Sequence, residues 1–197
     1  MATTETRDDA DTPSRILDVA ERLVQRRGFN GFSYADVASE LHITRASLHY
    51  HFPGKAELGE ALIERYATSF AEALNQVDRR VGDAPGKLEA YAELYADVLR
   101  RQRMCLCGML AAEYETLPQP MQDSVIRFFD FNEVWVERVL EQGERDGTLH
   151  LDGAASEIAR AIVSGLEGAM LVSRPNDDIA RFQATTGRLL GGLRTGR

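Results

Sequence analysis

Hydrophobic residues recur every three or four positions along most of the chain, which is the period of helices with one buried face. The first stripe covers residues 16–24, with Ser14 placed to cap its start and Gly28 placed to end it. A longer stripe over residues 58–77 predicts a helix from residue 55 to about residue 81. No stretch of the sequence sustains the alternation of a strand, so the pattern predicts an all-α fold.

A first short helix is predicted over residues 34–41. Ser33 precedes it and Asp36 lies three residues further on, which together form an approximate capping box. The tight turn after this helix is occupied by His42. Glycine is usual in such a turn, because the backbone there needs a residue that tolerates positive φ.

A second short helix is predicted over residues 45–51, with Thr44 at its N-cap and Leu48 facing inward. Its outward face carries polar and aromatic side chains. Two short helices joined by a short turn match the helix-turn-helix geometry, in which the second helix lies in the major groove of DNA. The same arrangement also occurs in helical hairpins that do not bind DNA.

Residues 16–70 resemble the N-terminal domain of TetR-type transcriptional regulators. The resemblance rests on three motifs, which read FSYADVA, ITRASL and HFPGKAEL in this sequence. Two positions depart from the family pattern. His42 replaces the usual turn glycine, and His49 stands where the family usually has a tyrosine that contacts phosphate, with Tyr50 one place later.

The resemblance implies that the second short helix reads DNA and that neighbouring side chains contact the DNA backbone. Lys55, in the first turn of the long helix, is expected to meet phosphate. The residues expected at the DNA are Ser33, Tyr34, Thr44, Arg45, Ser47, His49, Tyr50, His51 and Lys55.

The charge of the chain does not by itself indicate a DNA-binding protein. The formal net charge is −8, and residues 13–66 carry seven basic and seven acidic side chains. Basic domains are the usual electrostatic footprint of DNA-binding proteins. The interpretation therefore depends on placement, because a local cluster around Arg45 and Lys55 can face phosphates while acidic residues face away.

Three segments are expected along the chain. Residues 1–12 are polar, acidic and without periodicity, so we predict a disordered tail. Residues 13–58 form the expected helix-turn-helix domain, and residues 59–197 form a larger helical domain. The long helix is shared by both domains, so movement of one end must move the other. In the larger domain, helices are predicted over residues 88–99, 104–115, 121–143, 154–173 and 178–193.

The larger domain is rich in aromatic and methionine side chains, which line many pockets for small, largely apolar ligands. The same residue types also build ordinary helical cores. Together with the family resemblance, they predict an effector pocket lined by Tyr91, Tyr95, Met109, Glu113, Tyr114, Phe128, Phe131, Trp135, Leu166 and Met170. Glu113 is the candidate polar anchor, and a solvated surface carboxylate is the alternative.

Cys105 and Cys107 are the two cysteines of the chain. Placed two positions apart on a predicted helix, they point to different sides, which disfavours a mutual disulfide or a shared metal site. Arg100, Arg101 and Arg103 lie just upstream, and a helix N-terminus nearby would favour a thiolate that senses electrophiles or oxidants. Two small buried side chains are the alternative.

The last two predicted helices combine small residues with branched apolar ones. Small residues let helix backbones approach closely, and in the family this helix pair meets its twofold mate as a four-helix bundle. We therefore expect a homodimer whose interface includes Ile158, Ile162, Gly165, Ala169, Phe182, Leu189 and Leu190. A twofold dimer places its recognition helices about 34 Å apart and needs a palindromic operator.

These features predict a transcriptional regulator, a repressor released from double-stranded DNA when its small-molecule effector binds. A repressor triggered through Cys105 or Cys107 is the first alternative. The second is a helical small-molecule-binding protein or enzyme without a DNA function, although the sequence lacks P-loop, GxGxxG, HExxH and GxSxG motifs. No cofactor or metal is implied. Without an apolar run of about 18 residues or a charged-then-apolar leader, we expect a cytoplasmic protein with no membrane partner.

Overall fold

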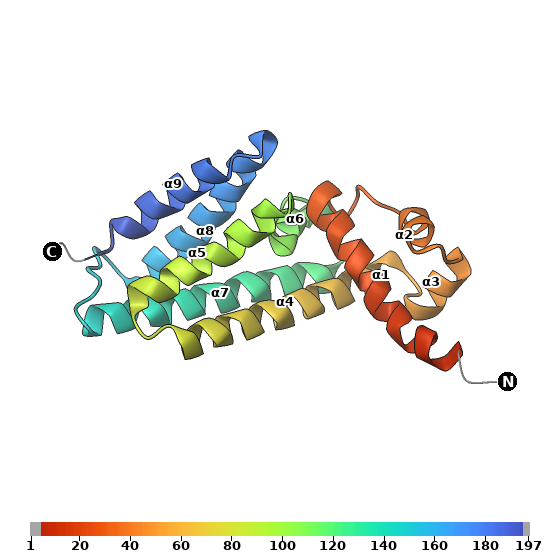
Figure 1. The fold of residues 1–197 in the computed structure, drawn as a ribbon, viewed down its shortest axis with the longest axis horizontal. Coiled ribbons are helices and arrows are strands. Elements are labelled where there is room, and N and C mark those ends of the chain that lie inside the picture. Colours follow the sequence, from red (N-terminus) through yellow and green to blue (C-terminus); the bar gives the residue numbers. More distant parts are fainter. Residues whose placement is uncertain (1–4, 195–197) are drawn as a thin grey trace. The chain divides into compact units, whose positions relative to one another are not determined.

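The computed structural model describes residues 5–194, with side chains from residue 11 onward. Within that range the ordered elements are helical and the all-α prediction is confirmed, with one isolated bridge between Leu149 and Arg194. The elements (Figure 1) are α1 (Glu5–Arg27), α2 (Tyr34–Leu41), α3 (Arg45–His51), α4 (Lys55–Arg80), α5 (Ala84–Arg100), α6 (Leu106–Ala111), η1 (Tyr114–Thr116), α7 (Gln119–Arg145), α8 (Ala155–Ser173), η2 (Arg174–Asn176) and α9 (Ile179–Gly191). None of these helices is both long enough and apolar enough to cross a membrane.

The chain divides into two compact units. The first unit contains the chain up to residue 66 together with residues 106–125. The second unit contains residues 67–105 and the chain from residue 126 onward. Two long helices, α4 and α7, therefore each contribute one end to the first unit and the other end to the second. The chain returns to the first unit through α6 and η1, which the sequence analysis did not anticipate.

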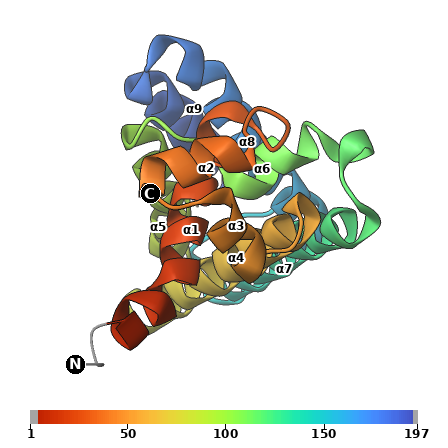
Figure 2. The same cartoon turned by 90° about the vertical axis from the view of Figure 1, so that its right-hand side faces the viewer.

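In the first unit, α1 contacts α2 and α6, and α2 contacts α3 (Figure 2). The local signals in the sequence all form as expected. Ser33 and Asp36 make a reciprocal capping box, and Thr44 accepts a hydrogen bond from the Ser47 N–H at 3.1 Å. His42 has φ 56°, the left-handed conformation that its turn requires. The two short helices therefore have the predicted bounds.

The N-terminal helix α1 begins at Glu5, so residues 5–12 are helical and the predicted disordered tail is corrected over that range. Residues 1–4 of that prediction lie outside the described residues. An acidic segment suits the N-terminal end of a helix, because it meets the positive end of the helix dipole. The same acidity is also typical of disordered segments, which is why the sequence alone favours a tail here. The helix also continues through Pro13, a residue that usually marks a helix start or break.

The predicted helix over residues 104–115 is shorter in the structure. Residues 106–111 form α6, and Cys105 precedes it, so the two cysteines do not share one helix. The hydroxyl of Thr116 donates to the carbonyl of Glu113 at 2.7 Å. This local side-chain hydrogen bond lies in the short 3-10 turn η1, which follows α6 where the prediction had continued helix.

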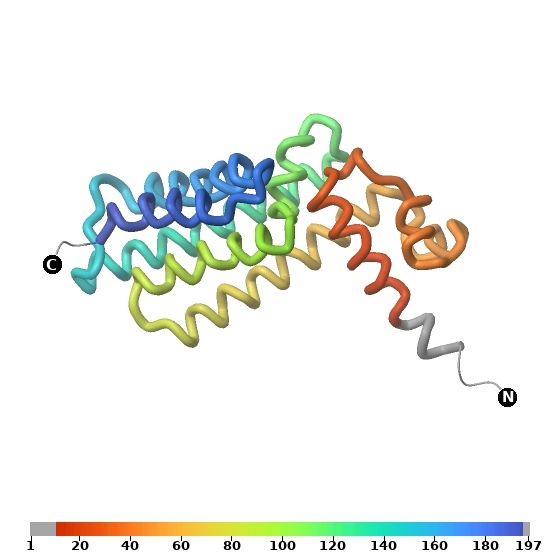
Figure 3. Tube along the Cα trace, turned by 45° about the horizontal axis from the view of Figure 1, so that its top comes forward, coloured from red at the N-terminus to blue at the C-terminus, as the bar shows by residue number. Residues whose placement is uncertain are grey.

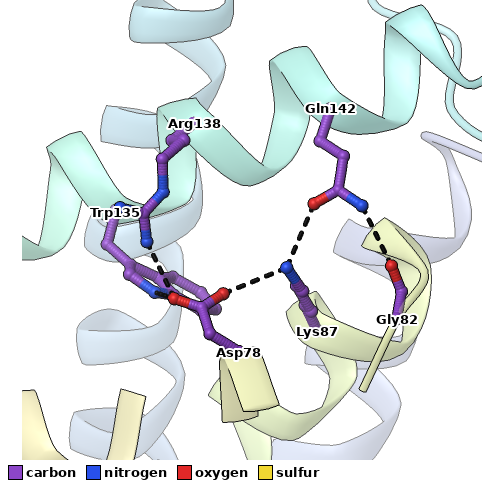
Figure 4. Close-up of polar contacts among 6 residues, drawn as sticks. All are labelled: Asp78, Gly82, Lys87, Trp135, Arg138 and Gln142. Atoms are coloured by element: carbon purple, nitrogen blue, oxygen red, sulfur yellow. Dashed lines mark hydrogen bonds and ion pairs between the residues drawn. The ribbon is translucent and has the colours of Figure 1, made fainter. Parts of the chain in front are cut away.

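In the second unit, α8 and α9 lie side by side and both contact α5 (Figure 3). One polar network joins the end of α4, the start of α5 and the middle of α7 (Figure 4). Asp78 accepts hydrogen bonds from the indole of Trp135 at 3.0 Å and from Arg138 at 2.8 Å, and pairs with Lys87 at 3.0 Å. Lys87 also donates to Gln142 at 3.1 Å. Burial acts to raise the pKa of Asp78, but hydrogen bonds from Lys87 and Trp135 leave it below its ordinary value.

Candidate functional site

The outward face of α3 carries the side chains expected to read DNA. Tyr50 is 80% exposed, and Arg45 and His49 are also exposed. Leu48 on the opposite face is fully buried, which fixes the rotation of this short helix about its axis. Thr44 caps α3 as an acceptor, so its own hydroxyl proton is left to donate outward. The arrangement presents cationic, hydroxyl and aromatic groups on one exposed face of α3.

A hollow of about 440 Å³ lies beside this face. It includes five of the expected DNA contacts, and its lining is Phe32, Ser33, Tyr34, Ala35, Arg45, His49 and Lys55. The first turn of α2 borders it, and backbone N–H groups at a helix start attract anions. The geometry therefore suits a phosphate group of the DNA backbone.

Ser33 and Tyr34 use their hydroxyl groups within the protein. The Ser33 hydroxyl donates to Asp36 at 2.6 Å. The Tyr34 hydroxyl lies 2.9 Å from the carbonyl oxygen of Phe52 and 2.5 Å from that of Gly54, across the turn between α3 and α4. Burial, aided by the nearby Glu57 carboxylate, raises the pKa of Tyr34 to about 12. These two residues shape the hollow.

Lys55 is also turned inward, although the sequence analysis expected it at phosphate. Its ammonium donates to the carbonyl oxygens of Phe29 at 2.5 Å and Phe32 at 2.6 Å. It lies 4.7 and 4.3 Å from the ring centroids of the same two residues, within cation–π range. Partial burial lowers the pKa of Lys55, while the charges of Glu113 and Asp36 act to raise it. The ammonium is thus committed to the loop between α1 and α2.

Glu113 holds the same loop by accepting hydrogen bonds from backbone N–H groups of the loop. Its Oε2 accepts from the Phe29 N–H at 2.5 Å and from the Asn30 N–H at 3.3 Å. Gly28 has φ +83°, and a Cβ there would lie 2.6 Å from Glu113 Oε1, so the close approach requires glycine. We call the pair Lys55 and Glu113 the loop clamp. The structure gives Glu113 this contact in place of the ligand role expected from the sequence.

His49 occupies the hollow in a defined tautomer. Its Nδ1 lies 3.0 Å from the Pro53 carbonyl oxygen, which can only accept a hydrogen bond, so Nδ1 carries a proton. The ring also packs against Tyr34 at a centroid distance of 4.8 Å. Nε2 is therefore an acceptor in the neutral ring and a donor in the protonated ring. Nearby His51 has an enclosed Nε2 without a hydrogen-bond partner in the described residues.

The second unit encloses a continuous group of aromatic rings. The Phe70 ring meets those of Tyr91, Tyr95 and Phe128 edge to face, at centroid distances of 6.1, 5.9 and 5.4 Å. Tyr91 also stacks on Trp135 at 5.5 Å. Four of the expected ligand residues, Tyr91, Tyr95, Phe128 and Trp135, are thereby brought together. Leu166 and Met170 of the same prediction are also buried in this unit.

Phe131 does not join this group, because it is 47% exposed. At helical spacing, Phe131 falls at the edge of the face of α7 that residues 128, 132 and 135 share, where its ring meets solvent. The expectation that Phe131 lines an interior pocket is therefore corrected. Met109, Glu113 and Tyr114 of the same prediction belong to the first unit.

A buried chain of hydrogen bonds runs through the aromatic group. The hydroxyls of Tyr91 and Tyr95 are 3.0 Å apart, and Tyr91 donates to Asn132 Oδ1 at 3.1 Å. Asn132 is fully buried and its amide donates to the Phe128 carbonyl at 2.7 Å. Asn132 is not among the residues predicted from the sequence, although a polar residue within the apolar stripe of α7 is a usable signal.

Glu167 on α8 is the second residue that the sequence analysis missed. The residue is half-buried, but its Oε1 is enclosed and has no hydrogen-bond partner in the described residues. Burial raises the pKa of Glu167 to about 7, although a hydrogen bond with the Cys105 thiol acts in the opposite direction. Burial raises the pKa of Tyr91 and Tyr95, and the charge of Glu167 acts to raise both further. Helix α8, which carries Glu167, contacts α5, which carries both tyrosines. We call Tyr91, Tyr95, Asn132, Glu167 and Cys105 the interior polar cluster.

The two cysteines are both buried thiols. Reactive cysteines sit in exposed, electropositive surroundings, because the thiolate is the reactive form. Cys105 instead meets a carboxyl, and Arg100 upstream is paired with Glu93 and Asp97. Nothing in this geometry favours the thiol-triggered alternative. The described residues also contain no group of three His, Cys, Asp or Glu side chains that could hold a metal ion.

The residues expected at a dimer interface fall into two groups. Ile162, Ala169, Phe182 and Leu190 are buried within the protomer, whereas Ile158, Gly165 and Leu189 are half-buried. The exposed face of α8 instead carries Gly168, Leu171 and Val172, the last two 61% and 57% exposed. The periodic apolar residues join α8 to α9 and α5, so they do not mark the outer face.

Comparisons with known proteins agree with this geometry. Residues 16–62 match the bacterial regulatory proteins of the tetR family, and residues 84–187 match the tetracyclin repressor-like C-terminal domain. A tetR-family regulator from Agrobacterium tumefaciens has a crystal structure with TM-score 0.92 and 31% identity, covering 95% of this chain and 100% of that one.

Two relatives in other bacteria support the same assignment. The transcriptional regulator AcuR of Cereibacter sphaeroides is 27% identical, over 82% of this chain and 77% of its own. The DNA-binding transcriptional repressor TetR of Mycobacteroides abscessus is 24% identical, over 90% of this chain and 82% of its own. The helix-turn-helix geometry, the helical second unit and both family matches lead to one assignment. The chain belongs to the tetR family of bacterial regulatory proteins, which are DNA-binding transcriptional regulators and not enzymes.

Proposed function

We propose that this protein is a cytoplasmic, homodimeric repressor that leaves a palindromic operator when a small molecule binds in its second unit. The observation that carries the proposal is the pairing of an exposed α3 face with an enclosed polar and aromatic cluster in a different unit. Repression is the activity named for the relative from Mycobacteroides abscessus, which matches over most of the chain.

The loop clamp offers a route by which effector binding changes the DNA-binding unit. Cys105 of the interior polar cluster is followed directly by α6, and Glu113 lies just beyond the end of α6. Glu113 bonds the loop before α2 through the Phe29 and Asn30 N–H groups. A shift of the chain after Cys105 therefore alters the support of α2 and, through it, the position of α3.

DNA binding is tested most simply with the promoter DNA that flanks the gene. Wild-type protein should bind it with sequence selectivity, and more weakly as salt rises, because phosphate contacts release counterions. Arg45→Ala combined with Tyr50→Ala should weaken binding by about 100-fold, since each direct contact contributes about 1–3 kcal/mol. Arg145→Ala, which removes an exposed cation at the end of α7, is the control. Equal binding by the double variant and the control would contradict the proposal.

The dimer surface is proposed on the outer faces of α8 and α9. Gly168, Gly187 and Gly191 are exposed, and a Cβ at each would meet no atom within 4 Å. Glycine inside a helix is destabilising by about 1 kcal/mol relative to alanine, so packing within the protomer does not explain these residues. Close approach of a partner helix does explain them.

Gly168→Leu tests this surface. The added side chain should separate the protomers and lower the molar mass measured by light scattering to that of a monomer. Gly82→Leu adds the same side chain at another exposed glycine with open space and should leave the mass unchanged. A dimer of unaltered affinity in Gly168→Leu would rule out this interface.

A further inference from the structure

The hydroxyl protons of the interior polar cluster are all used within the protein. Asn132 Oδ1 can only accept, so the single hydroxyl proton of Tyr91 points to it at 3.1 Å. Tyr95 must then donate its own proton to Tyr91 across the 3.0 Å contact. What remains at the end of this chain is a lone pair on the Tyr95 oxygen. The cluster therefore accepts hydrogen bonds and has no spare hydroxyl donor.

Glu167 adds a second acceptor to the same place. Its Oε1 is enclosed and unpartnered, and the thiol of Cys105 is the group that bonds the carboxyl. Among the described residues, Glu167 forms no ion pair with a basic side chain. A buried carboxylate without a cation is costly, and a protein usually pairs or neutralises it.

The rings next to these acceptors also favour a positive charge. Tyr91 and Tyr95 each meet Phe70, and Tyr91 stacks on Trp135, so both phenols belong to a continuous group of aromatic rings. The face of an aromatic ring carries a negative quadrupole that attracts cations, and ammonium ligands are bound in cages of this kind.

We propose that the interior polar cluster binds a small organic cation, with the ligand's ammonium group donating to Glu167 Oε1 and Tyr95 and packing against the aromatic rings. The proposal rests on the effector-dependent function proposed above and names the chemical class of the effector. Two buried methionines lie next to this cluster along the chain. Met104 directly precedes Cys105, and Met170 lies about one helical turn after Glu167 on α8. Their flexible thioether side chains can change rotamer to make room for the ligand.

A rival site for a charged ligand is less well matched. A cavity of about 360 Å³ lies at the ends of α5 and α8, with Arg100, Asp177 and Asp178 among its lining residues. Arg100 is paired with Glu93 and Asp97, Asp177 with Gln102, and Asp178 caps α9. Those charged groups already have hydrogen-bond or ion-pair partners within the protein, whereas Glu167 Oε1 has none.

Calorimetric titration of the full-length protein without DNA tests the proposal. Methylammonium, tetramethylammonium and benzylammonium chlorides are the cationic probes, and benzyl alcohol and sodium benzoate are the neutral and anionic counterparts of the last. Binding of at least one cation is expected, with benzyl alcohol and benzoate at least tenfold weaker than benzylammonium. Glu167→Gln keeps the shape of the side chain and should weaken cation binding at least tenfold. Glu157→Gln changes an exposed carboxylate of the same helix and should have no effect.

Three results would overturn the proposal: no binding of any of the three cations, equal binding of benzoate, or unchanged cation binding in Glu167→Gln. A melting curve in the absence of ligand checks that the variant folds. Failure of this proposal is distinguishable from failure of the proposed function, because DNA binding by α3 is measured separately and does not require the cation.

Discussion

Lys55 and Glu113 in the first unit are bonded on several sides, whereas Glu167 in the second unit meets one thiol. The ammonium of Lys55 has two carbonyl oxygens and two rings, and the carboxylate of Glu113 has two backbone N–H groups. The carboxyl of Glu167 has one unpartnered oxygen. Satisfied charges fix a conformation, so the first pair gives the loop before α2 a defined shape. A charged group that lacks a partner, such as Glu167, instead marks a place where a ligand can supply the missing hydrogen bond.

The largest effect is expected from removing the cation of the loop clamp. Lys55→Met keeps much of the side-chain volume but leaves the Phe29 and Phe32 carbonyls without their donor. Two hydrogen bonds to a charged group are lost, so the free energy of unfolding should fall by about 4 kcal/mol. Urea denaturation measures it, with Arg45→Met as an exposed control that should change stability by less than about 0.5 kcal/mol. Equal stabilities would mean that Lys55 is a surface residue available to phosphate.

In the second unit, the pH dependence of stability tests whether Glu167 is a buried carboxyl without a charged partner. Its folded pKa of about 7 is above the ordinary value of 4.5, so the folded state holds the proton more tightly than the unfolded state. The associated stability is fully present below pH 4.5 and is lost as pH rises through 7. Wild-type protein should lose as much as about 3 kcal/mol relative to Glu167→Gln over this window. Parallel stability curves between pH 5 and 9 would show that the carboxyl is not desolvated.

Asp78 sharpens the comparison, because it is a satisfied carboxylate in the same unit as Glu167. Asp78→Asn weakens its contacts with Lys87, Trp135 and Arg138 and should lower the free energy of unfolding by about 2 kcal/mol. The folded pKa is lowered, so this stability is present above the ordinary aspartate pKa of about 4 and is lost as pH falls through the folded value. Asp152→Asn, at an exposed position, is the control. A loss that persists unchanged in strong acid would point to packing and not to charge.

The smallest effect on stability is expected from Glu113→Gln. The amide oxygen still accepts from the loop N–H groups, but the charge that strengthens those bonds is gone, so the loss should be about 1 kcal/mol. DNA affinity should fall as well, because the loop before α2 is held less firmly. Glu115→Gln changes an exposed neighbour and should alter neither quantity. A stability loss without any change in DNA affinity would remove Glu113 from the proposed route between the units.

The sequence predicted those parts of the fold that depend on neighbouring residues. The capping box at Ser33, the cap at Thr44 and the turn at His42 involve partners within a few positions, so both short helices were placed correctly. Helical periodicity also located α4, α5, α7, α8 and α9 to within a few residues, although it placed the start of α1 too late. It failed at Phe131 on α7, because a helix with apolar residues on several sides does not reveal which side faces the core.

The rest depended on contacts between distant segments. Glu113 meets residues more than 80 positions earlier, and Lys55 folds back on the loop before α2. Glu167 is missed for a similar reason, since a glutamate on an amphipathic helix is normally solvated. Only the tertiary structure, in which α8 contacts α5, shows that one oxygen of its carboxyl is enclosed. The local sequence pattern therefore does not show which polar groups are buried by segments that are distant in the sequence.

The most direct measurement is the affinity for promoter DNA, determined by fluorescence anisotropy with and without a cation shown to bind by calorimetry. In wild-type protein the cation should raise the dissociation constant for DNA at least about tenfold, a coupling of about 1.4 kcal/mol. In Glu167→Gln the same cation should leave the dissociation constant unchanged. Wild-type protein whose DNA affinity is the same with and without the bound cation would contradict the account.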